Sequence, residues 1–224
     1  HLPDDCVELI RGYLAGEQYV KAREHFKIEG ALPHGHVEAV LAMFKRLELA
    51  RLLDRKPGPE RDLILAMIAQ RIIAAGSKLF TSRTLSQSTL AEELHVQGAS
   101  ADALYAAMDW LLERAEGIEQ RLARRHLRDG EPVLYDLSSS YFEGRHCPLA
   151  MRGYSRDGRR GSLQIVYGLM CDRFGRPIAV EVFSGNTIDS QTIPNQITKV
   201  RKRFTLREVV LVSDRGMVTK ANLA

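Results

Sequence analysis

The sequence predicts an α/β protein, in which a mainly helical region at residues 1–130 precedes a mixed β-sheet region at residues 131–224. Two observations predict this division. Up to about residue 128, apolar residues recur at helical spacing with few strand signals. After Glu131-Pro132 the pattern changes to short apolar or alternating runs, which are typical of strands. With 224 residues, 45% of them hydrophobic, the chain can bury a sizeable core.

The helical region contains two amphipathic stripes, at residues 37–47 and 63–72. Pro57-Gly58-Pro59 separates them, because two prolines and a glycine stop one helix and Pro59 can begin the next. We expect a further helical pair at residues 101–112 and 117–127. Residues 88–95 and 101–110 also have the outline of a helix-turn-helix, whose second helix can enter the major groove of DNA. Most helix pairs of this kind are only packing units.

The second region predicts the order β β β α β. Strands are expected at residues 133–137, 163–171 and 178–183, and the turn-rich residues 172–177 make the second and third an antiparallel hairpin. Asn186 and Thr187 can cap a helix at residues 189–203, and residues 208–213 are typical of a fully buried strand. A helical crossover would place this fourth strand beside the first and parallel to it, which gives the sheet order 3-2-1-4.

Two aspartates are expected at the tips of these central strands, Asp136 after the first and Asp214 after the fourth. Like charges at short range raise one pKa unless a cation shares them, and hard carboxylate oxygens are ligands that Mg²⁺ prefers. The sequence therefore predicts that Asp136 and Asp214 are catalytic and bind metal. The alternative is that each aspartate merely caps a strand end or a turn.

Positive charge is concentrated in the second region. The net charge is +4 and the pI about 9.0, which by itself indicates little. Residues 145–176, however, contain seven arginines against two acids, and a second cluster follows at residues 199–207. Arginine-rich patches suit bidentate contacts to phosphate, although a solvated face is the plainer reading.

The remaining composition bears on compartment and completeness. Cys6, Cys147 and Cys171 are widely spaced, which favours free thiols in a reducing compartment, and the histidines lack the spacing of a zinc site. No apolar run is long enough for a membrane span and no export signal begins the chain, so we expect a cytoplasmic protein without a membrane partner. Because the chain begins with His and ends in what reads as the start of a helix, we expect a portion of a longer protein.

Four blocks in the second region resemble the catalytic domain of bacterial insertion-sequence DDE transposases. They are residues 135–144 (YDLSSSYFEG), 153–159 (GYSRDGR), 182–187 (VFSGNT) and 212–217 (VSDRGM). The helical region resembles the part that precedes this domain in the same family, notably at residues 77–79 and 104–111. The resemblance implies that the sheet is an incomplete ribonuclease H-like fold.

The resemblance also implies the chemistry. Asp136 and Asp214 would be the first two acids of an Asp-Asp-Glu triad whose Glu comes from a helix further downstream. Glu143 lies in a loop region and is expected to be a supporting group instead. The intact enzyme would use two Mg²⁺ or Mn²⁺ ions to cut transposon ends in double-stranded DNA and to join the freed 3′-hydroxyl to target DNA. It would act as a homo-oligomer, and the chain without the downstream Glu is expected to be inactive.

DNA contacts are expected from the arginines near this site and, through the helix-turn-helix outline, from the helical region. The arginines are Arg145, Arg152, Arg156, Arg159, Arg160 and Arg215. Such phosphate contacts would hold DNA without choosing its sequence. Arg215 could equally face a carboxylate. Two alternatives remain, a ribonuclease H-like nuclease that cuts without joining and an inactive, truncated DNA-binding remnant.

Overall fold

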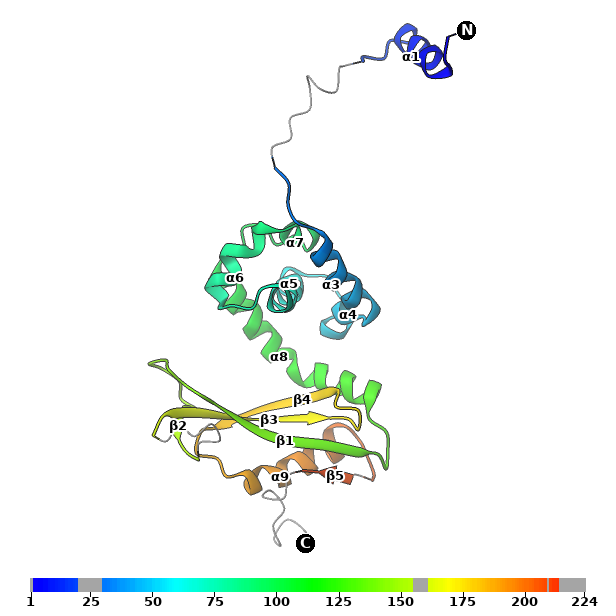
Figure 1. Cartoon of the computed structure of the whole chain (residues 1–224). Coiled ribbons are helices and arrows are strands. Elements are labelled where there is room, and N and C mark those ends of the chain that lie inside the picture. The colour runs from blue at the N-terminus through cyan, green and yellow to red at the C-terminus, as the bar shows by residue number, and fades with distance from the viewer. Residues whose placement is uncertain (1, 20–29, 155–160, 209, 214–224) are drawn as a thin grey trace.

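The computed structural model describes residues 2–19, 30–154, 161–208 and 210–213 (Figure 1). The helices before the sheet are α1 (Asp4–Leu14), α3 (Gly35–Arg46), α4 (Leu49–Leu53), α5 (Pro59–Ile73), α6 (Lys78–Thr84), the 3-10 turn η1 (Leu85–Gln87), α7 (Leu90–Glu93) and α8 (Ala101–His126). The sheet region contains β1 (Pro132–Tyr141), β2 (Met151–Arg152), β3 (Leu163–Cys171), β4 (Pro177–Ser184), α9 (Asp189–Thr198), the π-helix η2 (Lys199–Arg203) and β5 (Val210–Val212). A helical region followed by a mixed sheet is the predicted class.

Helix α5 lies in the middle of the helical region, with α3, α4, α6 and α7 around it (Figure 1). It begins at Pro59, as the Pro57-Gly58-Pro59 break predicts, and proline is suited to a position whose N–H has no helical partner. Six of its residues are buried, and the five apolar ones form one hydrophobic cluster with α3, α7 and the first half of α8. Packing against neighbours on several sides is the reason that its sequence is apolar nearly all round.

The predicted helical pair at residues 101–112 and 117–127 is wrong, because α8 is one continuous helix of 26 residues. Ser100 caps it by accepting a hydrogen bond from the N–H of Ala103 at 3.1 Å. A glycine inside a helix, such as Gly117, costs about 1 kcal/mol relative to alanine. Tertiary contacts on both sides of the glycine offset that cost. Before it, Arg114 donates to the Asp54 carboxylate just after α4, and after it, Arg121 donates to carbonyls at the end of α4.

The helix-turn-helix outline at residues 88–110 is also not what the structure contains. The first helix was expected at residues 88–95, but α7 comprises only Leu90–Glu93. Leu90 and Ala91 are buried in the helical cluster, so this short element serves packing. Residues 88–110 therefore contain a one-turn helix before α8 instead of two full-length helices, and DNA contact by this region stays a prediction.

The predicted sheet order is confirmed. Strand β3 pairs antiparallel with β1 on one side and with β4 on the other, and β5 pairs parallel with β1, which gives β4-β3-β1-β5. The two-residue β2 adds to β3 beside the start of that strand. The order is the one expected for part of a ribonuclease H-like sheet.

Several boundaries differ from the predicted ones. Strand β1 continues to Tyr141, because its polar second half keeps pairing with β3, so Asp136 lies inside the strand and not at its tip. Helix α9 begins after Ile188, and neither Asn186 nor Thr187 caps it. The β5 strand is not fully buried: Val210 and Val212 are 51% and 46% exposed, since β5 lies at the edge of the described sheet.

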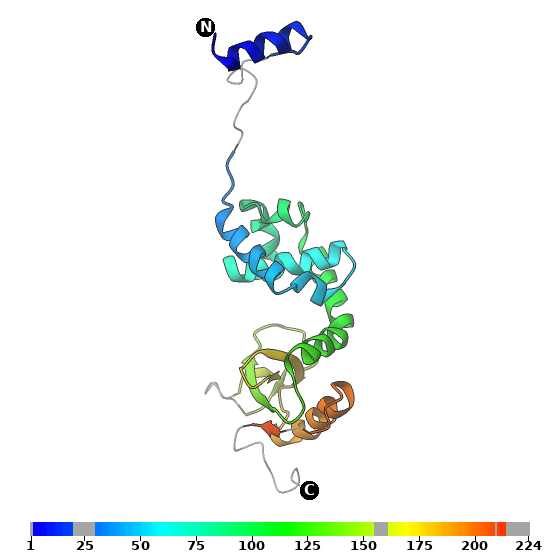
Figure 2. The ribbon, with the colours of Figure 1, turned by 90° about the vertical axis from the view of Figure 1, so that its right-hand side faces the viewer.

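One face of the sheet is covered and the other is open. Val133, Tyr135 and Leu137 of β1 are buried on the covered face, in a second hydrophobic cluster. This cluster also contains Ala123 and Leu127 at the end of α8 and Ile193, Val200 and Phe204 of the α9–η2 segment. Figure 2 shows α8 leading from the helical region to the sheet with α9 beside the strands. Whether the two clusters mark independently folding domains stays a prediction.

No single helix in the described residues is both long and apolar enough to cross a membrane. Helix α5 and residues 78–87 meet at 93° and are together long and apolar enough for a broken span, by length and composition only. Helix α5 is largely buried in the helical cluster.

Candidate active site

Asp136 projects from the open face of the sheet. Burial alternates along β1, and Asp136 and Ser138 are exposed between the buried residues of the covered face. Its neighbour across the antiparallel pair is Leu169 of β3. One carboxylate oxygen, Oδ1, accepts a hydrogen bond from the N–H of Leu137 at 2.9 Å. Because the Asp136 side chain is exposed, its carboxylate faces solvent in the middle of the sheet.

The surface around Asp136 is hollowed into a depression of about 700 Å³. Its walls come from three strands and the β3–β4 turn: Leu134, Tyr135, Leu137 and Ser138 of β1, Tyr167, Leu169 and Cys171 of β3, Gly175 of the turn, and Val212 and Ser213 at the end of β5. Asp136 is the one acid among these described lining residues. A single carboxylate in a mainly apolar hollow can bind a cation together with a charged group of a ligand, but it makes no complete metal site alone.

The second predicted acid, Asp214, lies outside the described residues. The described parallel pairing of β1 with β5 runs from Pro132↔Val210 to Leu134↔Val212. Within the described part of the chain, no group of three or more His, Cys, Asp or Glu side chains could hold a metal ion. The assignment of Asp136 and Asp214 as metal ligands therefore stays a prediction.

Behind Asp136, on the covered face, Tyr135 anchors the strand. Burial raises the pKa of its phenol to about 12, and the buried hydroxyl has no hydrogen-bond partner among the described residues. Gly168 makes room for this ring, because a Cβ at that position would overlap the Tyr135 hydroxyl. The tight packing fixes the part of β1 from which Asp136 projects.

The predicted DNA-binding arginines are only partly described. Arg145 lies exposed in the segment after β1, and Arg152 lies exposed on β2 instead of in a loop. Arg156, Arg159, Arg160 and Arg215 lie outside the described residues. The arginine-rich segment leaves the sheet at the pair Tyr141↔Gln164, five positions along β1 from Asp136↔Leu169, or about 17 Å at the usual rise of a strand. That these arginines act beside Asp136 stays a prediction.

Sequence reasoning missed Gln164, which joins two of the four blocks. Its buried side-chain amide donates hydrogen bonds to the carbonyl oxygens of Tyr154 at 2.9 Å and Gly185 at 2.8 Å. The backbones also approach closely there, because a Cβ on Gly153 or Gly185 would overlap neighbouring carbonyl oxygens. A single glutamine in an otherwise apolar strand was the available signal, since a buried amide needs partners.

Neither a family model nor a curated protein matches the chain. Solved structures with some likeness include the Mos1 transposase paired-end complex with the left transposon end, at 13% identity and a TM-score of 0.29. The likeness covers 100% of this chain and 65% of that chain, so this chain spans about two thirds of its length.

Two further structures with some likeness are also of Mos1 transposase. A pre-cleavage Mos1 transpososome has 14% identity and a TM-score of 0.29, with coverage of 100% of this chain and 75% of that one. The mariner Mos1 paired-end complex with Mg has 15% identity and a TM-score of 0.25, with coverage of 99% and 64%. TM-scores this low do not indicate a shared fold or a shared function.

Proposed function

We propose that this chain is part of a DDE transposase of the insertion-sequence type, which cuts and joins double-stranded DNA by metal-dependent phosphoryl transfer. The observation that carries the proposal is the position of Asp136, an exposed carboxylate on the open face of β1, next to the strand that leads to Asp214. The four sequence blocks that resemble this family support it, as does the sheet order.

The register of the two parallel strands supports pairing the two acids. Each described pair joins residues 78 positions apart, as in Pro132↔Val210 and Leu134↔Val212. Asp136 and Asp214 are separated by the same interval, since 214 − 136 = 78. If the register continues unchanged, the two carboxylates face one another on one side of the sheet.

The residues near Asp136 fit a hard cation, because the carboxylate is exposed on the open face and Mg²⁺ prefers such hard oxygen ligands. Asp136 and Asp214 would hold Mg²⁺, which when bound activates the attacking oxygen and neutralises charge on the scissile phosphate. The apolar wall formed by Leu134, Leu169 and Val212 would limit access of water to one side of the phosphate. Arginines of the segment at residues 144–161 would orient the DNA backbone.

The test measures metal binding and DNA cleavage separately. Mn²⁺ titration followed by electron paramagnetic resonance should show that Asp136→Asn and Asp214→Asn each weaken Mn²⁺ binding by at least about tenfold. Asp109→Asn, which changes an exposed acid of α8, is the matched control and should bind Mn²⁺ as the unchanged chain does. Equal Mn²⁺ affinity in all four proteins would remove the metal site from this position.

Cleavage is measured on labelled duplex DNA with the same proteins. Each variant is also made in a longer form that includes the downstream acid. Metal-dependent cleavage and strand joining should be lost in both active-site variants and retained in the control. Cleavage without joining would instead favour a ribonuclease H-like nuclease.

A further inference from the structure

A third group of arginines, outside the two basic stretches of the sequence, surrounds a pocket between α4 and α8. The pocket has a volume of about 140 Å³ and is lined by Glu48, Arg51, Leu52, Arg55, Arg121 and Arg125. Four arginines and one glutamate give these lining residues a formal charge of 4 − 1 = +3. So much positive charge around one small pocket is costly unless anions share it.

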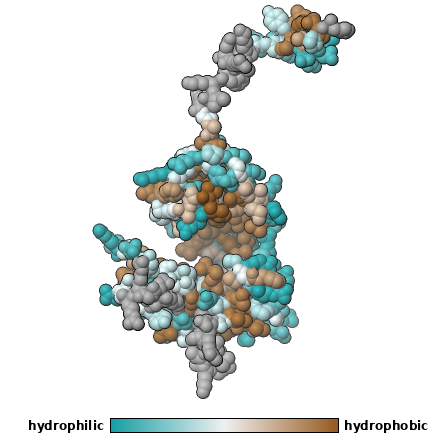
Figure 3. All heavy atoms as spheres, in the orientation of Figure 1, coloured by the Kyte–Doolittle hydropathy of each residue, from teal (hydrophilic) through white to brown (hydrophobic). Residues whose placement is uncertain are grey.

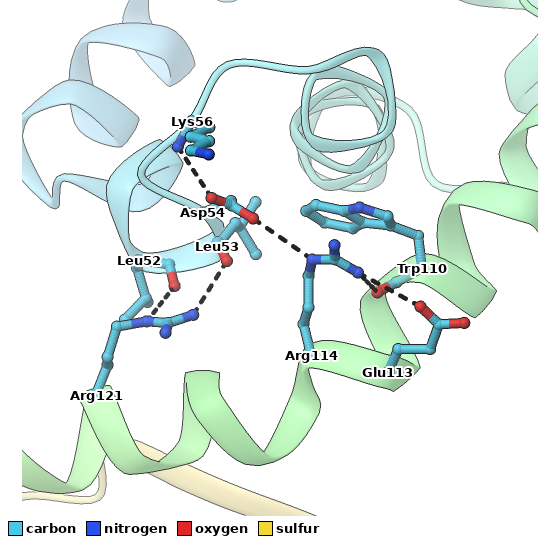
Figure 4. Close-up of polar contacts among 8 residues, drawn as sticks. All are labelled: Leu52, Leu53, Asp54, Lys56, Trp110, Glu113, Arg114 and Arg121. Atoms are coloured by element: carbon cyan, nitrogen blue, oxygen red, sulfur yellow. Dashed lines mark hydrogen bonds and ion pairs between the residues drawn. The ribbon is translucent and has the colours of Figure 1, made fainter.

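Two of these arginines are held in place by the end of α4. Arg121 donates from Nε to the carbonyl of Leu52 at 2.9 Å and from Nη2 to the carbonyl of Leu53 at 3.0 Å (Figure 4). Arg125 donates to the carbonyl of Leu47 at 2.8 Å and to the Glu48 carboxylate at 2.7 Å. Since a guanidinium has five N–H donors, each keeps donors for a further acceptor. Their positions are fixed before any ligand arrives.

The other two arginines have no comparable role in the fold. Arg51 is 68% exposed, and its ion pair with Glu48 is long, at 3.8 Å. For Arg55, which is exposed, no ion pair or side-chain hydrogen bond is found within the described ranges. Capping of the α4 carbonyls therefore accounts for Arg121 and Arg125 but leaves the charge of Arg51 and Arg55 unexplained.

Further basic residues extend from this pocket. Lys56 follows Arg55, and Arg124 and Arg128 are exposed in and just after the last turn of α8. The pocket volume suits one phosphate group, and the flanking charges suit a ligand that carries phosphates in series. Planar guanidinium groups bind phosphate oxygens through paired hydrogen bonds.

We propose that the α4–α8 pocket binds a backbone phosphate of duplex DNA, with Arg51 and Arg55 closing on a phosphate that Arg121 and Arg125 receive. This inference rests on the proposed function, because that function makes duplex DNA the ligand. It gives the helical region a sequence-independent contact that needs no helix-turn-helix. The DNA path then includes this pocket as well as the sheet.

The experiment measures duplex DNA binding by fluorescence anisotropy across a range of salt concentrations. Arg51→Ala combined with Arg55→Ala should reduce the log–log salt slope by about 1 unit, equally for duplexes of different sequence, because one phosphate contact is lost. The matched control combines Arg46→Ala with Arg83→Ala, which removes two exposed arginines elsewhere in the helical region and should leave the slope unchanged. Circular dichroism melting confirms that both variants fold.

Arginine labelling of the unchanged chain gives a second readout. Phenylglyoxal modification, followed by mass spectrometry, should fall at Arg51 and Arg55 when duplex DNA is present, and stay constant at Arg46 and Arg83. An unchanged salt slope, unchanged labelling, or no DNA binding at 50 mM salt would each overturn the phosphate site. The Mn²⁺ titration at Asp136 is independent of all three outcomes, so the proposed function is judged separately.

Discussion

Asp172 organises the turn between β3 and β4. Its side chain is buried, with Oδ1 accepting hydrogen bonds from the N–H groups of Phe174 and Arg176 at 2.9 Å each. The Arg176 guanidinium donates to Oδ2 at 2.6 Å. Burial acts to raise the pKa of this carboxyl, but these hydrogen bonds and the Arg176 charge outweigh it, so the pKa lies below its ordinary value. The ionised form is therefore the one that the fold stabilises.

Replacing this carboxylate should change how stability depends on pH. Because the folded-state pKa lies below the unfolded value of about 3.9, the contribution of Asp172 is fully present above that value and is lost as the pH falls through the folded-state pKa. Asp172→Asn should lower the free energy of unfolding by about 1–3 kcal/mol at pH 7 and by less in acid. Urea denaturation at several pH values measures this. An equal loss at every pH would contradict the assignment, and Asp109→Asn serves as the exposed control.

Helix α8 shows where local preference and tertiary contacts disagree. Gly117 lies in its middle, where a helical glycine costs about 1 kcal/mol relative to alanine. The space around it is sufficient, since a Cβ there would have Arg121 Nη1 as its closest neighbour at 3.4 Å. The glycine is therefore not required by packing within the described residues.

Gly117→Ala should accordingly raise the free energy of unfolding by about 0.5–1 kcal/mol. Gly175→Ala should act in the opposite direction and cost about 1–2 kcal/mol, because Gly175 has a φ of 78°, which side-chain-bearing residues rarely adopt. Thermal denaturation followed by circular dichroism compares the two. A loss of stability in Gly117→Ala would mean that the helix is interrupted there, as the sequence had predicted.

The elements could be predicted where the signal is local. Pro57-Gly58-Pro59 marked the start of α5, a β-prone run marked β3, and alternating apolar residues marked β4. The second half of β1 could not be found in this way, because its serines carry no apolar signal and are held by pairing with β3. Within the candidate site, a motif located Asp136, but its exposure in the middle of a strand depended on the whole sheet.

The arginine pocket could not be predicted for a related reason. Arg121 and Arg125 are four residues apart on α8, which puts them on one side of that helix, whereas Arg51 lies in α4 and Arg55 follows its end. The sequence does not say that the two pairs meet. The contact between α4 and α8, about 70 positions apart, brings them together.

At the scale of the whole molecule, charged side chains tie α8 to the sheet. Glu119 accepts a hydrogen bond from the N–H of Val180 at 3.2 Å and from Arg203 at 2.9 Å. Lys199 lies 2.8 Å from the Glu181 carboxylate and 3.9 Å from that of Glu119. Both the Glu119 and Lys199 side chains are only 10% exposed, so this network joins α8, β4 and η2 in a largely buried setting.

The surface differs from this charged network, because apolar side chains lie on it in both the helical region and the sheet region (Figure 3).

A double-mutant cycle should detect this connection. Glu119→Ala and Arg203→Ala should each destabilise the protein, and the double variant should lose about 1–3 kcal/mol less than the sum of the two. Urea denaturation provides the free energies of unfolding. Additive losses would show that the pair contributes nothing beyond separate contacts, and the surface pair Arg51→Ala with Glu48→Ala gives the expected small coupling of an exposed ion pair.

The continuity of α8 has a further geometric consequence. Arg121 and Arg125 face α4, while Ala123 and Leu127, two positions further on, pack into the sheet core. Residues two apart on a helix point in nearly opposite directions, so the same turns serve both partners across a thickness of about 10 Å. Helix α8 is thus a shared wall, with the arginine pocket on one side and the sheet core on the other.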